Sequence, residues 1–344
     1  MTKIIDFKDG IDNWELEEIK KSFTNGKLVI FPTETVYGIG ANALDKDAVD
    51  SIFIAKGRAQ DNPLIVHISN FEMLKNLVEE PNEIEQKLID ALMPGPFTLI
   101  LKKKEGVIPD NVTCGLDTVG IRFPENKIAQ EIIEYTGLPI AAPSANISSR
   151  PSGTNIDDIK DEFDGKVDLI VDGGETKIGL ESTVCKVIDG IPTILRPGKI
   201  TPEDIETIIG SVDIDKHVFA STKSNERVES PGMKYKHYAP NTECILVYGH
   251  SDQDYLDLIN ENKKEKTTII GFSEHKELFK DCIFHDLGSK DNLDEISHNI
   301  FTLLRKADKD NSDIIIIEGV EKKGLGIAIM NRLLRSCSFN YFEK

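Results

Sequence analysis

Short apolar runs alternate with amphipathic, helix-like segments along almost the whole chain, and this alternation constrains the fold more than any other feature. Strands that alternate with helical patterns predict a sheet covered by helices, which is the α/β class. The pattern lapses once, between residues 211 and 243, where polar residues surround one short apolar patch, Val218-Phe219-Ala220. We therefore expect two α/β domains, residues 1–210 and 244–344, joined by a linker over residues 211–243.

In the first domain we expect a strand at each apolar run and a helix at each segment of helical period. The predicted strands are 27–31, 64–68, 97–102, 119–123, 139–142, 169–172, 182–188 and 192–196. The predicted helices are 48–56, 72–78, 83–93, 127–135 and 156–163, followed by one that begins at Thr201 with Pro202 in its first turn. Asp189-Gly190 predicts a hairpin turn between the last two strands.

The second domain shows the same alternation over about 100 residues. Its predicted strands are 244–248, 267–272, 282–287 and 314–318, and its predicted helices are 252–260, 293–306 and 327–336. This order predicts a small Rossmann-like unit.

Composition excludes several functional classes. Lys and Arg total 41 and Asp and Glu total 59, so the formal charge of 41 − 59 = −18 argues against a broad interface with a phosphate backbone. The chain lacks an apolar run of membrane-spanning length, and its first ten residues lack the pattern of a secretory signal. Five scattered cysteines without a CxxC spacing are typical of reduced thiols in a cytoplasmic protein.

The sequence argues against three common kinds of site. The chain contains no GxxxxGK[ST] sequence, so it is not a P-loop enzyme. The stretch Gly324-Leu325-Gly326 lacks the third glycine of a dinucleotide fingerprint and is better interpreted as a loop that opens the last helix. The seven histidines show no HxxxH or HExxH spacing, which argues against a structural metal site.

Two loops between Phe31 and His67 concentrate the side chains that suit an anionic ligand. Lys56 and Arg58 can supply positive charge, and Thr33, Thr35 and Asn62 can supply directed hydrogen bonds. Later loops add Thr118, Arg122, Ser144, Asn146, Ser182 and Arg196. Together these residues predict a nucleotide site that lacks a glycine-rich cradle.

Each of these residues also has an ordinary structural explanation. A single arginine at a strand end is commonly solvated, a turn serine commonly caps its own backbone, and His67 could be a core histidine. Tyr235 and Tyr238 in the linker could simply pack against a domain.

The order and spacing of the motifs resemble a known family. The stretches FPTETVYG, KGR followed by NPL and a histidine, DTVGIRFP, APSAN and the STV…RPG hairpin resemble the YrdC-like domain of threonylcarbamoyl-AMP synthases. The linker SPGMKYKHYAP and the terminal GLGIAIMNRLLRS resemble the long, two-domain form of that family. The resemblance covers nearly all of residues 15–344, with one departure: Ala59 follows KGR where a proline is expected.

The resemblance implies a twisted α/β sheet curved around a concave, positively charged cavity. It also implies a nucleotidyltransferase that joins L-threonine, bicarbonate and ATP, with Mg²⁺ held mainly by ATP oxygens, and releases pyrophosphate. The product would pass to the machinery that adds threonylcarbamoyl to tRNA, with weak or indirect contact to the tRNA itself.

By the same resemblance, individual residues acquire roles. The residues implied to contact ATP are Lys56, Arg58, Asn62, Thr118, Ser144, Arg196 and Tyr235. Those implied to contact threonine are Thr35, His67, Arg122, Ala142 through its backbone, and Ser182. Lys56 and Arg58 would act in catalysis by offsetting the charge on the departing pyrophosphate.

Three alternatives stay open at this point. A YrdC-like domain could serve as an RNA-binding module, against which the net charge of −18 counts. It could also perform the carbamoyl-adenylate chemistry of hydrogenase maturation, but the acylphosphatase and zinc-finger segments of those proteins are missing from this sequence. The linker could be either a lid over the active site or a charged tether.

Overall fold

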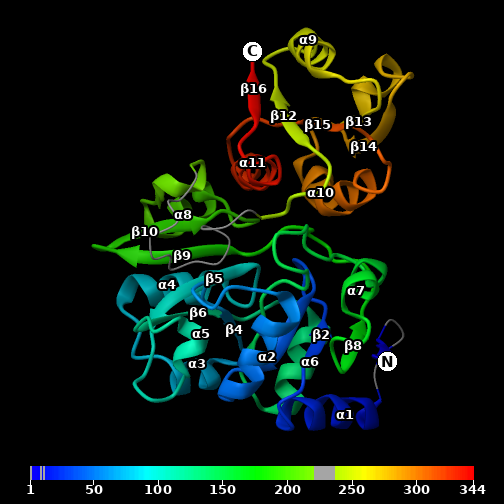
Figure 1. The fold of residues 1–344 in the computed structure, drawn as a ribbon. Coiled ribbons are helices and arrows are strands. Elements are labelled where there is room, and N and C mark those ends of the chain that lie inside the picture. Colours follow the sequence, from blue (N-terminus) through cyan, green and yellow to red (C-terminus); the bar gives the residue numbers. More distant parts are fainter. Residues whose placement is uncertain (1, 8–9, 11, 221–236) are drawn as a thin grey trace. The chain divides into compact units, whose positions relative to one another are not determined.

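The computed structural model describes every residue except 1, 8–9, 11 and 221–236, and its chain forms two compact units (Figure 1). The first unit comprises Met1–Ser148, Gly153–Lys177 and Glu181–Lys234. The second comprises Ser149–Ser152, Ile178–Leu180 and Tyr235–Lys344. Among the described residues, no helix combines the length and the apolar character needed to cross a membrane.

A single mixed sheet forms the frame of the first unit. Its eleven strands lie in the order β1-β8-β2-β3-β7-β4-β6-β5-β9-β10-β11. Their bounds are β1 (Lys3–Asp6), β2 (Val29–Phe31), β3 (Gly38–Asn42), β4 (Ile65–His67), β5 (Phe97–Lys102), β6 (Thr118–Arg122), β7 (Ile140–Ala141), β8 (Leu169–Asp172), β9 (Thr183–Ile188), β10 (Ile191–Arg196) and β11 (Asp213–Ile214).

Several helices of the first unit begin at a residue whose side chain caps their first backbone amides. The Asp45 side chain caps the start of α2, and Gly57 ends it in the left-handed conformation with φ of 59°. The helices are α1 (Asn13–Thr24), α2 (Lys46–Lys56), α3 (Phe71–Leu77), α4 (Glu83–Leu92), α5 (Asp110–Thr113), α6 (Lys127–Thr136), α7 (Ile156–Phe163) and α8 (Pro202–Ile209), with a 3₁₀ turn η1 (Lys216–Val218).

The alternation of side chains along the strands separates two faces in the half of the sheet formed by β4, β6, β5, β9 and β10. One face joins the main core, together with apolar residues of α2, α3, α4 and α8. The opposite face carries a small apolar cluster of strand residues only, which are Ile65, Ile100, Val184 and Leu195. Polar side chains of the same strands share this second face, and they include His67, Thr118, Arg122 and Arg196 of the predicted site.

A five-stranded sheet, in which every recorded pairing is parallel, forms the second unit, in the order β14-β13-β15-β12-β16. Its strands are β12 (Cys244–Tyr248), β13 (Thr267–Phe272), β14 (Ile283–Gly288), β15 (Ile314–Glu318) and β16 (Tyr341–Glu343). Its helices are α9 (Asp252–Asn262), α10 (Leu293–Ala307) and α11 (Leu325–Ser336), with a 3₁₀ segment η2 (Ser273–Leu278). All residues of β15 are buried, as expected for a central parallel strand.

The predicted α/β class with a Rossmann-like second unit is confirmed. Strands 97–102, 169–172 and 244–248 have the predicted bounds. The sequence missed β3, because its residues Gly38–Asn42 have weak strand propensity. A Cβ atom at Gly40 would lie 2.7 Å from the Phe31 ring, so close packing requires the glycine that obscures the strand.

The predicted linker over residues 211–243 contains β11 and η1 at its start. Residues 221–236 fall outside the described part of the chain, and this range includes Tyr235. The prediction of a lid therefore stays a prediction.

Candidate functional site

Strand register brings three polar side chains into one row across neighbouring strands. His67 of β4 lies opposite Arg122 of β6, and Arg122 lies opposite Thr98 of β5. All three side chains are buried. Because adjacent strands are about 4.8 Å apart, residues in register on one face are close neighbours. Residues far apart in the sequence, at positions 67, 98 and 122, therefore form one surface.

A β-bulge extends this row to Arg196. The β9–β10 register shifts between Ile194 and Arg196, so that Arg196 lies opposite Val184. The Arg196 guanidinium then donates from Nε to the Ser182 carbonyl at 3.1 Å and from Nη2 to the Ser182 hydroxyl at 3.0 Å. The same hydroxyl lies 2.8 Å from the Thr98 hydroxyl. Thus the bulge turns Arg196 toward Ser182 and joins two predicted site residues.

The loop after β2 holds the other end of the row. Arg122 donates from Nη2 to Glu34 Oε1 at 2.6 Å, and both side chains are buried. Thr33 accepts from the amide groups of Thr35 and Val36, and its hydroxyl lies 2.8 Å from the Thr35 hydroxyl. This short polar turn fixes Glu34 and Thr35 beside Arg122.

Glu34 is a residue that the sequence analysis missed. Its second carboxylate oxygen accepts from the Asn126 amide at 3.3 Å, so it links the loop after β2 to the start of α6. A glutamate within the otherwise apolar and hydroxyl-rich stretch FPTETVYG was the available signal. A buried arginine needs an acidic or polar partner, and the sequence offers this one nearby.

His67 is fully enclosed and electrically neutral. Burial, reinforced by the charges of Arg122 and Arg196, lowers the pKa of His67 to about 3. Its ring also meets the Phe31 ring edge-on, with centroids 6.5 Å apart. At physiological pH the imidazole can therefore offer one donor and one acceptor, and it adds no charge to the two arginines.

The Lys56 side chain reaches the turn Pro143-Ser144-Ala145-Asn146, which we call the PSAN turn. Its ammonium group donates to the carbonyls of Ser144 and Asn146, the latter at 2.6 Å, and approaches Asn146 Oδ1 at 3.5 Å. The Ser144 hydroxyl donates to the same amide oxygen at 2.6 Å. Lys56 is 1% exposed, and its ammonium group stabilises this turn. This geometry gives Lys56 a positioning role in the turn, and its placement beside the phosphates stays a prediction.

Ala142 lies between this turn and the row. Its amide donates to the carbonyl of Ile65, the first residue of β4, at 3.0 Å. A backbone contact from Ala142 to a substrate would therefore have to be made by its carbonyl.

Arg58 follows the left-handed residue that ends α2. Its Nη2 donates to the carbonyls of Asn62 and Pro63 at 3.1 and 3.2 Å, so the guanidinium folds back over its own loop. The Asn62 side chain is 1% exposed. Ala59, the departure from the family pattern, is exposed on the same loop.

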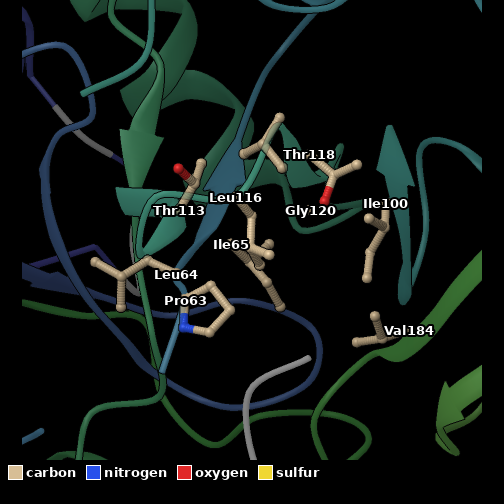
Figure 2. Close-up of a pocket in the computed structure, with 10 residues that line it drawn as sticks. Pro63, Leu64, Ile65, Ile100, Thr113, Leu116, Thr118, Gly120 and Val184 are labelled. Atoms are coloured by element: carbon tan, nitrogen blue, oxygen red, sulfur yellow. The ribbon is translucent and has the colours of Figure 1, made fainter. Parts of the chain in front are cut away.

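Thr118 lines a small cavity at the start of β6, together with Pro63, Ile65 and Gly120 (Figure 2). The cavity measures about 10 Å³, which is enough for about one water molecule. A nucleotide base cannot enter it as it stands. A contact between Thr118 and ATP would have to be made outside this cavity.

A larger groove of about 670 Å³ opens near the end of α2, lined in part by Lys27, Ser51 and Lys166. Lys56 is its only lining residue from the predicted site. Because the arginines and His67 do not line it, this groove is not where the predicted site residues meet.

Asn62, His67 and Arg122 of the predicted site each hold a buried polar atom that has no hydrogen-bond partner among the described residues. They are Asn62 Oδ1, His67 Nδ1 and Arg122 Nε. Buried polar groups in folded proteins are nearly always paired, so each unpaired atom needs an explanation. Two of the three, His67 Nδ1 and Arg122 Nε, belong to residues that lie opposite each other in the row.

Hydrogen bonds and strand register thus join the predicted residues into three groups. The first is the row with its loop, which holds Thr35, His67, Arg122, Ser182 and Arg196. The second is the PSAN turn with Lys56 and Ser144, and the third is the loop of Arg58 and Asn62. Tyr235 lies outside the described residues. Within the described part of the chain, no three His, Cys, Asp or Glu side chains gather as a metal site would require.

Two family models match the chain. One, described as "Telomere recombination", matches residues 21–198, and the other, "Threonylcarbamoyl-AMP synthase, C-terminal domain", matches residues 200–338. The chain is 46% identical to the threonylcarbamoyl-AMP synthase of Pyrococcus abyssi, with 100% of both chains covered. It is 42% identical to that of Bacillus subtilis, covering 90% of this chain and 89% of the relative. The crystal structure of P. abyssi Sua5 complexed with L-threonine is similar, with a TM-score of 0.93 and 44% identity over 100% of both chains.

Proposed function

The chain belongs to the threonylcarbamoyl-AMP synthase family, and we propose that it converts L-threonine, bicarbonate and ATP into threonylcarbamoyl-AMP and pyrophosphate. Its product would supply the threonylcarbamoyl modification of tRNA, with the enzyme working in the cytoplasm. The observation that carries the proposal is the row of buried donors from His67 to Arg196. In this row, Arg122 Nε and His67 Nδ1 have no hydrogen-bond partner among the described residues.

The threonine site would be the end of the row nearest Glu34. Arg122 gives Nη2 to Glu34, which leaves Nε and Nη1 to face a carboxylate. Neutral His67 would accept or donate at the amino or hydroxyl group, depending on its tautomer. Thr35, Ser182 and the Ala142 carbonyl would complete the contacts.

ATP would occupy the space between the PSAN turn and the loop of Arg58 and Asn62. Arg58 and Arg196 would face the phosphates, and Asn62 Oδ1 would gain the partner that it lacks among the described residues. Ser144 and Thr118 would contribute hydroxyl groups, and Tyr235 would approach from the linker. Lys56 would act indirectly, because its ammonium group holds the turn that carries Ser144.

The chemistry would proceed in two steps. The threonine amine forms a C–N bond with bicarbonate and water leaves, giving a carbamate. A carbamate oxygen then bonds to the α-phosphorus of ATP as the bond to the β-phosphate oxygen breaks, and pyrophosphate leaves with the electron pair. The protein's main contribution would be to position the reactants and to stabilise charge on the departing pyrophosphate. Mg²⁺, bound to ATP oxygens, would neutralise part of the phosphate charge.

Pyrophosphate release tests the proposal directly. The complete mixture should release pyrophosphate at a steady rate, and omission of either threonine or bicarbonate should reduce the rate to background. Release that continues without threonine would indicate simple ATP hydrolysis and would contradict the proposed reaction. Binding of tRNA at physiological salt with no pyrophosphate release would favour the RNA-binding alternative.

A further inference from the structure

Two cysteines of the second unit bring their sulfur atoms together. Cys244 is the first residue of β12, and Cys337 directly follows α11. Their Sγ atoms lie 2.9 Å apart, although 93 positions separate them in the sequence. Both side chains are buried, with 7% and 3% of their surface exposed, and both are thiols. Such a contact brings two sulfurs nearer than separate thiols normally approach.

Rigid elements on both sides hold the two sulfurs in place. β12 pairs in parallel with β15 through Cys244↔Ile315 and with β16 through Leu246↔Tyr341. On the other side, the Cys337 amide donates to the Leu333 carbonyl at 3.0 Å and so stays attached to α11. The pair therefore does not depend on an exposed loop, and the two thiols have a high effective concentration relative to each other.

The segment after Cys337 also needs to be held. Ser338 and Phe339 have φ of 51° and 62°, in the left-handed region that side-chain-bearing residues rarely adopt. This turn leads directly into β16, which returns to lie beside β12. A covalent bond between Cys337 and Cys244 would fix the start of the turn against the strand with which its end pairs.

We propose that Cys244 and Cys337 form a site of covalent modification, a disulfide made by exchange with a small disulfide of the glutathione class. One thiolate attacks the small disulfide, forms a mixed disulfide and releases one thiolate of the reagent. The second cysteine thiolate then attacks the Sγ of the first, and the second reagent thiolate leaves. One Sγ–Sγ bond forms, two cysteine protons pass to the leaving thiolates, and the reagent takes up two electrons.

The expected consequence is a more stable second unit. A cross-link that closes a loop of 93 residues restricts the unfolded chain strongly, since the effect grows with loop length. This inference departs from the prediction of reduced thiols, which followed from the spacing of the five cysteines alone. It does not depend on the proposed enzymatic reaction.

The test uses the full chain, first reduced and then equilibrated with oxidised glutathione. Thiol titration in denaturant should count five cysteines before oxidation and three after it. The intact mass should fall by two hydrogen atoms, and peptide mapping should join Cys244 to Cys337. The melting temperature of the oxidised protein should exceed that of the reduced protein by about 5–10 °C.

Matched variants identify the pair without requiring that every variant fold. Cys282→Ser, which removes a cysteine outside the pair, should still lose two thiols on oxidation, whereas Cys244→Ser and Cys337→Ser should form no internal cross-link. If the unmodified protein keeps all five thiols, carries only glutathione adducts, or joins another pair, the inference is overturned. If the cross-link forms without raising the melting temperature, the stabilising role is overturned.

Discussion

His67 in the first unit and His275 in the second are both buried, and burial lowers the pKa of each, but their neighbours make the net shifts opposite. In the first unit, burial and the neighbouring arginines lower the pKa of His67 to about 3. In the second, the hydrogen bond to the Glu318 carboxylate raises the pKa of His275 above its usual value. The Nδ1–Oε1 distance in the second pair is 2.7 Å, and the two side chains are 1% and 0% exposed.

We interpret this difference as the contrast between a ligand-binding site around His67 and a structural hydrogen-bonded pair around His275. Around His67, cationic and neutral donors gather with no surplus acceptor, and Arg122 Nε lacks a partner among the described residues. Around His275, the Glu318 carboxylate accepts both from the histidine and from the Phe272 amide at 2.6 Å. The first arrangement gathers positive charge and suits an anionic ligand, whereas the second already holds its carboxylate, although His275 Nε2 lacks a hydrogen-bond partner among the described residues and lies 3.5 Å from Asp252 Oδ1.

The largest expected effect comes from breaking the pair in the second unit. Glu318→Ala should lower the free energy of unfolding by about 3–5 kcal/mol, because it leaves a buried histidine and a backbone amide without their acceptor. Urea denaturation measures the loss. Glu321→Ala, at an exposed position, is the control and should change stability by less than about 0.5 kcal/mol. Equal stability of the two variants would show that the buried pair is not structural.

The next effect concerns the proposed threonine site. Arg122→Ala should reduce kcat/KM for threonine about 100-fold, because a charge-assisted contact worth about 1.5–3 kcal/mol is lost and Glu34 is left buried without its cation. Arg122→Lys should recover only part of this loss, since an ammonium group cannot bind two oxygens side by side. Lys102→Ala, an exposed change on β5, is the control. Unchanged threonine kinetics in Arg122→Ala would contradict the site.

A smaller effect should follow when the partner of Arg122 is changed. Glu34→Gln keeps the size of the side chain but removes the charge that orients the guanidinium, so we expect KM for threonine to rise about 10-fold. If Glu34 only positions Arg122, kcat should change little, and KM for ATP should stay the same. A large fall in kcat with unchanged KM would instead place Glu34 in the chemical step.

The smallest effect is a dependence of stability on pH. Because the pKa of His275 is higher in the folded state than its usual 6.5, the stabilisation is fully present below pH 6.5 and is lost as the pH rises through the folded-state value. The urea midpoint should therefore fall above pH 6.5, and His275→Gln should flatten the curve. Asp252 also faces this ring and favours its protonated form.

In an NMR titration, His67 should show no protonation between about pH 5 and 8.

The sequence predicted much of the fold because strands and helices carry periodic patterns. Residues 97–102 and 156–163 were placed at their true bounds, and the cap at Thr201 marked the start of α8. Strand β3 was missed because close packing there requires glycine. The roles of Ser149–Ser152 and Ile178–Leu180 in the second unit were also missed, because a loop sequence carries no signal of what it packs against.

The candidate residues were found from the sequence, but their arrangement was not. No local pattern shows that a bulge at Arg196 turns it toward Ser182, because bulges depend on the partner strand. Nor could the sequence show that the Lys56 ammonium group donates to the turn that carries Ser144, since that contact joins residues 88 positions apart. Glu34 was missed for the same reason, as its partner lies on another strand.

A crystal structure of the protein with L-threonine and a non-hydrolysable ATP analogue tests the central claim most directly. We predict that the threonine carboxylate will lie against Arg122, next to His67, with the phosphates between Arg58 and Arg196. The same structure should show Asn62 Oδ1 and Arg122 Nε paired with ligand atoms. Ligands bound elsewhere, with those atoms still unpaired, would contradict the account.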